Sequence, residues 1–380
     1  MVLLLATLTD CYSNMPIEHY PRLTILDVLK VTACLIIVVH HVVVYGALSK
    51  VAYPLAPTLI DWFREYGRIS VQVFFVVSGY LFATKFSSQQ YGQFQITAPL
   101  EIIRHRYQRL ITPYLAALIL AILCASFARI LLKENFIPNE PSLFQLLAHI
   151  FLLQDLLDQE VLSAGVWYVA IDFQLFSFSI ALLWLANQIN IRYPKIPMRG
   201  EWLVIGFAVM ALFFFNRNSD WDETVFYFYG SYGMGIMIYW ACSNRHSMQW
   251  VILLLLLLLA TLFIDFRIRI AIAGISMLAI ALTHYSNKLR YLTIPKIFTK
   301  LAQASYSIFL VHFSVIMIMN TIFQFLPVQP EIYFFGLFLT VAASITVGIL
   351  FFTWFESRLV GNQTRILLVM GLIGFGLIVD

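Results

Sequence analysis

The segment from Leu26 to Leu48 is an apolar run interrupted by four ionisable side chains. Its sequence is LDVLKVTACLIIVVHHVVVYGAL. It is long enough to cross a bilayer as a helix, which takes roughly 20 residues. Asp27 and Lys30 stand near its start, and His40 and His41 stand near its middle. Because ionisable side chains are costly inside a membrane-spanning helix, these four are candidate functional residues.

Helical geometry places three of these side chains on one stripe. At about 100° per residue, Lys30 and His41 are roughly 20° apart around the helix axis, and Asp27 lies about 40° from His41. His40 lies about 80° from Lys30 around the axis and therefore points to one side of the stripe. Two interpretations stay open: a functional His41, or two histidines that hydrogen-bond to neighbouring helices and hold them together.

Composition places the whole chain in a membrane. Of its 380 residues, 61% are hydrophobic and only 12% are charged, whereas soluble domains carry about 25% charged residues. The predicted fold is an all-α, polytopic membrane helix bundle of about ten transmembrane helices. The predicted spans are 26–48, 69–86, 108–131, 166–187, 201–216, 225–242, 248–264, 267–284, 304–325 and 331–355.

Two further apolar segments are short for a span. We interpret residues 143–157 as an amphipathic or re-entrant segment, and residues 366–379 as a tail that lies on the membrane or partly enters it. The basic residues alternate between loops as an even number of spans requires, so both termini are predicted to be cytoplasmic. The predicted organisation is an N-terminal segment (1–21), one transmembrane domain (22–358) and a short apolar tail (359–380). The four cysteines have no metal-binding spacing, so no metal site is expected, and nothing in the modest net charge of +4 indicates nucleic-acid binding.

Arg106 and Arg109 stand three residues apart in RHRYQRL, at the predicted cytoplasmic start of the third span. This spacing puts them on one helix face. With Lys30, at the cytoplasmic start of the first span, they form a set of cations that could hold phosphate groups. The alternative is that they are ordinary cytoplasmic basic residues that interact with lipid headgroups.

Three other spans also carry polar candidates. Asp172 lies in an apolar run close to the outer end of the fourth span and needs a partner there. A histidine partner would be oriented by the carboxylate and stabilised when protonated, whereas an arginine partner would lock two helices together. His312 has no charged neighbour in the sequence to satisfy it. Ser78 and Gly79 allow close helix approach in the second span.

Five stretches, taken together, resemble the acyltransferase-3 family of membrane acyltransferases. In chain order they are PRLTILDVLKVTACLIIVVHH, FFVVSGYLFATKF, RYQRLITPYL, VWYVAIDFQLF and SYSIFLVH. The first contains the family's spacing of a basic residue, ten residues and a histidine, here Lys30 and His41. The third contains the family's paired arginines, Arg106 and Arg109. The resemblance runs from about residue 22 to about residue 356.

The fourth and fifth stretches add candidates and departures. Trp167 and Tyr168 belong to the fourth stretch, and Tyr306 belongs to the fifth together with His312. Asp172 stands where the family usually has glutamate. Lys30 and Val28 likewise replace the usual arginine and glycine, which indicates a divergent subgroup. We expect no fused extracytoplasmic hydrolase-like domain.

The resemblance implies transfer of an acyl group, often acetyl, from cytoplasmic acyl-CoA to a hydroxyl of a cell-envelope carbohydrate or lipid-linked glycan. His41 would act as general base or acyl-relay residue, supported by Asp172 or His312. Lys30, Arg106 and Arg109 would meet the phosphates of acyl-CoA, which is a donor substrate and not a permanently bound cofactor. The expected location is the bacterial inner membrane, with membrane lipids, glycan-assembly proteins or a second copy of the chain as partners.

Two other readings fit the same residues. One is a proton-coupled transporter that uses His41 and Asp172 as a relay, although the chain lacks the internal half-repeat of many transporters. The other is a structural partner of a glycan-assembly complex. Transfer or hydrolysis of acyl-CoA by the purified protein would separate the enzyme from the transporter.

Overall fold

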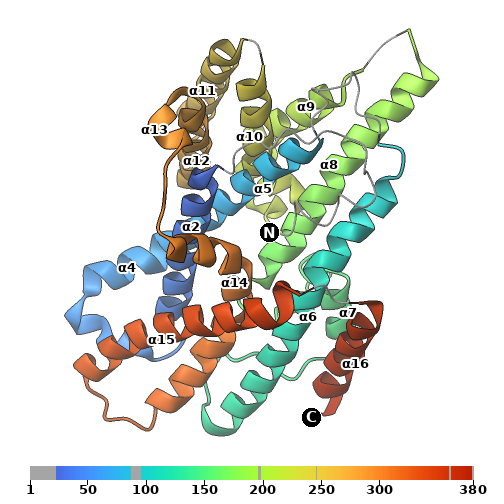
Figure 1. Cartoon of the computed structure of the whole chain (residues 1–380). Coiled ribbons are helices and arrows are strands. Elements are labelled where there is room, and N and C mark those ends of the chain that lie inside the picture. Colours follow the sequence, from blue (N-terminus) through green and yellow to red (C-terminus); the bar gives the residue numbers. More distant parts are fainter. Residues whose placement is uncertain (1–22, 87–95, 196–197, 245, 359–360, 379–380) are drawn as a thin grey trace.

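The computed structural model describes residues 23–86, 96–195, 198–244, 246–358 and 361–378, and within these ranges the chain is built from helices without strands. It is an all-α, polytopic helix bundle, as predicted (Figure 1).

Nine described helical segments are long and apolar enough to cross a membrane. They are built on α2 (Thr24–Val44), α5 (Val71–Phe86), α6 (Pro99–Leu131), α8 (Val166–Arg192), α9 (Gly200–Phe213), α11 (Ser247–Ile264), α12 (Ile268–Tyr285), α14 (Lys296–Phe323) and α15 (Pro330–Phe351). The shorter α-helices are α3 (Leu48–Ala52), α4 (Pro57–Tyr66), α7 (Leu143–Ile150), α13 (Asn287–Arg290) and α16 (Asn362–Ile378). Single turns complete the set: η1 (Tyr53–Leu55), η2 (Gly67–Ser70), η3 (Phe215–Arg217), η4 (Ser219–Trp221) and the π-helical η5 (Phe352–Glu356). The predicted N-terminal segment, 1–21, lies outside the described residues.

The predicted span that is not among these nine, 225–242, is α10 (Val225–Ser243), a helix of 19 residues in the interior of the bundle. It is rich in tyrosine and glycine, most of its residues are buried, and it packs against α5, α9, α11 and α12. A helix enclosed by other helices does not face lipid, so it tolerates polar side chains that a lipid-facing helix cannot carry. The lipid-facing pattern is seen in α11, where only Leu258 and Thr261 are buried and Leu253, Leu256 and Leu259 are exposed.

Two glycines let α5 and α10 approach closely. A Cβ atom at Gly79 of α5 would overlap the carbonyl oxygen of Tyr232, and one at Gly235 of α10 would overlap the carbonyl oxygen of Val76. Small residues at such a crossing allow the two backbones to touch. The structure therefore gives Gly79 the close-approach role that the sequence suggested.

Gly79→Ala is expected to destabilise the protein by about 1–3 kcal/mol, because the added methyl group forces α5 and α10 apart. The measurement is the thermal unfolding midpoint of the detergent-purified variant. Gly206→Ala is the matched control, since a Cβ atom added at Gly206 on α9 would meet no neighbouring atom within 4 Å. A Gly79→Ala midpoint equal to that of Gly206→Ala would contradict this view of the crossing.

The end of α2 is fixed to α14 by one side chain. Gly46 has a left-handed backbone (φ +89°) in the turn that follows α2. The Oδ1 atom of Asn320 on α14 accepts a hydrogen bond from the backbone N–H of Ala47 at 2.9 Å. A Cβ atom at Gly46 would overlap the Asn320 side chain. This contact sets the position of α2 along α14.

The segment between α6 and α8 returns along α6. Tyr107, near the start of α6, donates a hydrogen bond from its Oη to the carbonyl oxygen of Ile150 at 2.7 Å. Because α6 rises about 1.5 Å per residue, Tyr107 lies roughly 36 Å from Leu131, where the chain leaves that helix. The side-chain amide of Gln174 on α8 donates to the carbonyl oxygen of Leu152 at 3.2 Å. These contacts support the re-entrant interpretation of residues 143–157.

The helix α7 buries both of its polar side chains, and the side chains that it exposes are apolar. Gln145 and His149 are buried, whereas Phe144 and Leu147 are exposed. A helix with this inverted pattern suits a lipid environment better than a water-facing surface. The predicted tail forms α16, which packs beside α6 and α7 (Figure 1), and Arg365 of α16 donates from Nε to Thr112 Oγ1 at 3.2 Å.

Candidate active site

His41 of α2 and His312 of α14 meet in the interior of the bundle. The Nδ1 atom of His41 lies 2.6 Å from the Nε2 atom of His312, which is hydrogen-bonding distance. The two ring planes are within 7° of each other. Both side chains are buried, at 7% and 0% exposure. Two residues separated by 271 positions in the chain therefore form one imidazole pair.

The neighbouring His40 has a different environment. Its Nδ1 atom donates to the carbonyl oxygen of Phe63 on α4 at 2.8 Å. The Cβ atom of His40 packs closely against Gly67, and a side chain added at position 67 would collide with it. The interpretation that histidines hold helices together therefore describes His40, which ties α4 to α2.

Asp172 pairs with Arg106. An Nη2 atom of Arg106 on α6 lies 2.5 Å from Oδ2 of Asp172 on α8, and the guanidinium also lies over the Phe176 ring, 5.4 Å from its centroid. Among the described residues no hydrogen bond joins Asp172 to His41. Of the two partners that the sequence allowed for Asp172, the structure shows the arginine, which joins α6 to α8. The partner of His41 is instead the imidazole of His312.

The ion pair also corrects the expected depth of Asp172. The sequence placed Arg106 at the cytoplasmic start of its span and Asp172 near the outer end of another. Their contact shows that the two side chains lie at the same depth. The segment between α6 and α8 accounts for the difference, because it carries the chain back along α6 before α8 begins at Val166.

Lys30 and Asp27 form a second buried ion pair, with Lys30 Nζ 3.2 Å from Asp27 Oδ1. Two of the three predicted phosphate-binding cations, Lys30 and Arg106, thus have carboxylate partners. Arg109 has neither an ion pair nor a side-chain hydrogen bond within the described ranges. The carboxylate of Glu356 is close enough to attract it.

A family model described as an acyltransferase domain matches residues 23–353. The chain belongs to the acyltransferase-3 family. No curated protein and no solved structure matches it. The matched range covers the bundle from α2 to α15 and contains every candidate residue that the sequence predicted. The molecule is a membrane acyltransferase, and its buried polar groups are candidates for substrate binding and catalysis.

Two charged residues of this acyltransferase were not selected from the sequence. Glu356 lies at the end of η5 and accepts a hydrogen bond from Ser307 Oγ of α14 at 2.6 Å. Lys85 lies at the end of α5, close enough to Arg106 and Arg109 to repel them. The signal for Glu356 was present in TWFESRL, where one carboxylate directly follows a long apolar run.

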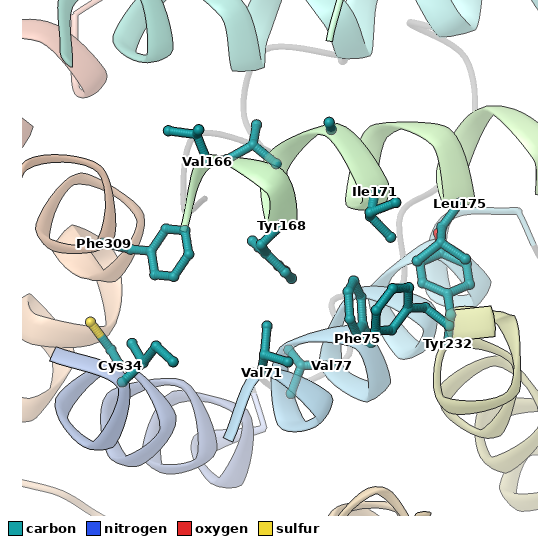
Figure 2. Close-up of a cluster of buried hydrophobic side chains, with 14 of the residues drawn as sticks. Cys34, Val71, Phe75, Val77, Val166, Tyr168, Ile171, Leu175, Tyr232 and Phe309 are labelled. Atoms are coloured by element: carbon teal, nitrogen blue, oxygen red, sulfur yellow. The ribbon is translucent and has the colours of Figure 1, made fainter. Parts of the chain in front are cut away.

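Aromatic side chains link the two polar sites of the acyltransferase. Tyr168, one turn before Asp172 on α8, packs against Phe309 of α14 with ring centroids 5.4 Å apart and against Phe75 of α5 at 5.0 Å (Figure 2). Trp167 packs against Phe228. These contacts give Trp167 and Tyr168 a packing role.

Two candidates predicted from the sequence remain, Tyr306 and Ser78. Tyr306 donates from its Oη to the carbonyl oxygen of Leu110 on α6 at 3.2 Å, and Ser78 is half-buried on α5. Over the part of the chain that the structure describes, no group of three or more His, Cys, Asp or Glu side chains could hold a metal ion.

Proposed function

We propose that this acyltransferase moves an acyl group, in the first instance acetyl, from cytoplasmic acyl-CoA to a hydroxyl of a cell-envelope carbohydrate or lipid-linked glycan. The observation that carries the proposal is the buried His41, hydrogen-bonded to a second imidazole inside the matched acyltransferase domain. Imidazole exchanges a proton near neutral pH, which is the property that a general base needs.

The reaction can be written with His41 as the group that moves the proton. His41 removes the proton from the acceptor hydroxyl, and the oxygen attacks the carbonyl carbon of the thioester. The carbon–sulfur bond then breaks, and the protonated imidazole returns the proton to the leaving sulfur. The products are an ester on the acceptor and free CoA thiol.

The cations near the start of α6 are the proposed contact for the phosphates of acyl-CoA. Arginine suits this role because its guanidinium forms paired hydrogen bonds with phosphate oxygens. Of the three predicted phosphate-binding cations, Arg109 is the most available to a phosphate, because Lys30 and Arg106 each contact a carboxylate. Lys85 adds positive charge at the same place.

The test is thiol release by the detergent-purified protein from acetyl-CoA, with and without an envelope-glycan extract. The expected result is release that increases when the extract is added, with label from radioactive acetyl-CoA recovered on the glycan. Absence of both binding and release, with acetyl-CoA and with longer acyl-CoAs, would overturn the proposal and favour the proton-coupled transporter.

Arg109→Ala is expected to raise KM for acyl-CoA about tenfold or more with a smaller effect on kcat, because it removes a charge-assisted contact to phosphate. Arg104→Ala is the matched control: Arg104 lies on the same helix and carries the same charge, but its side chain is exposed. Initial rates of thiol release at varied acetyl-CoA give both constants. Equal KM values for the two variants would remove Arg109 from the donor site.

A further inference from the structure

Both ring nitrogens of His312 are engaged, and one contact fixes its tautomer. Its Nδ1 atom lies 2.6 Å from the carbonyl oxygen of Phe309, one helical turn earlier on α14. A carbonyl oxygen can only accept, so Nδ1 of His312 must carry the proton and donate it. In the neutral ring, Nε2 of His312 then holds a lone pair.

That lone pair determines the tautomer of His41. Nε2 of His312 lies 2.6 Å from Nδ1 of His41 and, as an acceptor, requires a proton on that atom. The neutral His41 ring consequently carries its own lone pair on Nε2. The hydrogen bonds run in one direction, from His41 Nδ1–H to His312 Nε2 and from His312 Nδ1–H to the Phe309 carbonyl.

We infer that His312 is a positioning residue that holds His41 in the tautomer whose Nε2 accepts the proton from the acceptor hydroxyl. This inference rests on the proposed function, in which His41 is the base. His312 itself is unsuited to be the base, because its two nitrogens already donate and accept within the bundle. Its part resembles that of the aspartate which orients the imidazole in a serine-hydrolase triad.

A neutral partner suits this location better than a carboxylate. A carboxyl group that is buried in a membrane protein must be paired with a cation whenever it is ionised, and Asp172 meets this requirement by pairing with Arg106. The His312 ring is neutral in the resting state and still accepts a hydrogen bond. When His41 becomes protonated during the reaction, that bond becomes charge-assisted and strengthens.

The surrounding packing keeps the two rings in this alignment. Phe309, which supplies the accepting carbonyl, is held by the rings of Phe74 and Tyr168. Asn320, two turns further along α14, fixes the turn after α2. The two histidines are therefore held at the same depth by contacts outside the pair.

The test compares two amides at position 312. A glutamine places its side-chain oxygen where Nε2 of His312 lies and can still accept from His41 Nδ1–H, whereas the side chain of asparagine is one carbon shorter and cannot reach. We expect His312→Asn to lower kcat about 10- to 100-fold with unchanged KM for acetyl-CoA, the range found when a metal-binding histidine loses the group that orients it. We expect His312→Gln to stay within about threefold of wild type.

Three outcomes decide between the possibilities. A folded His312→Asn variant with wild-type kcat, measured beside an inactive His41→Ala, would overturn the positioning role and leave the proposed function intact. If the asparagine variant does not fold, a folded His312→Gln variant that binds acetyl-CoA but does not release thiol overturns it equally. Failure of the wild type to release thiol from any acyl-CoA would instead overturn the proposed function. His40→Gln controls for a substituted histidine beside the site, because His40 donates to Phe63 and not to the pair.

Discussion

His41→Ala is expected to lower the rate of acyl transfer by about 100- to 10,000-fold, the range typical of losing a general base. His41 lies at the end of the hydrogen-bonded chain that begins at the Phe309 carbonyl. Alanine leaves no group there that can remove a proton from a hydroxyl. The fold should persist, because His312 keeps its bond to Phe309 and the turn after α2 keeps its contact with Asn320.

The matched control is His40→Ala, which removes the same ring from the adjacent position of the same helix. His40 holds α4 through the Phe63 carbonyl, so its loss should cost about 1 kcal/mol of stability. We expect its rate of thiol release to remain within about threefold of wild type. Full activity in His41→Ala, or equal losses in the two variants, would show that His41 is not the base.

The sequence identified the first half of this site from the cost of ionisable side chains in a spanning helix and from helix geometry. Leu26 to Leu48 was predicted as one spanning helix, and α2 covers most of that range. The stripe of Asp27, Lys30 and His41 follows from about 100° per residue. Helix geometry could not reveal that His41 meets His312, because a helical wheel describes one helix and does not show which other helix packs against it.

The depth of Asp172 shows a second limit of sequence reasoning. Hydropathy assigns each apolar run to a full crossing and each gap to a loop at a membrane face. Residues 132–165 instead return along α6, so that Asp172 meets Arg106. The short apolar run with buried His149 and Gln145 carried the signal for this path, but only the contacts with Tyr107 and Gln174 fix its direction.

Asp172→Ala is expected to reduce the free energy of unfolding by about 3 kcal/mol, near the lower end of the cost of removing one partner from a buried ion pair. Asp172 is 4% exposed, and its loss leaves the guanidinium of Arg106 buried without its carboxylate. The cost stays near this lower end because the Arg106 side chain retains 18% exposure and can move toward water. Thermal and denaturant unfolding of the detergent-purified protein measure this loss.

A double replacement, Arg106→Met with Asp172→Leu, separates stability from function. Buried ion pairs are often no more stabilising than apolar residues of similar volume, so the double variant should be more stable than Asp172→Ala. If Arg106 also contacts the phosphates of acyl-CoA, the double variant will still have a raised KM for acetyl-CoA despite its recovered stability. Recovery of both stability and KM would mean that the pair only joins α6 to α8.

An unchanged unfolding midpoint in Asp172→Ala would show that the carboxylate contributes little to holding Arg106 in place. A stable double variant with a raised KM for acetyl-CoA would show that the pair contributes to acyl-CoA binding and that apolar side chains can replace it in joining α6 to α8.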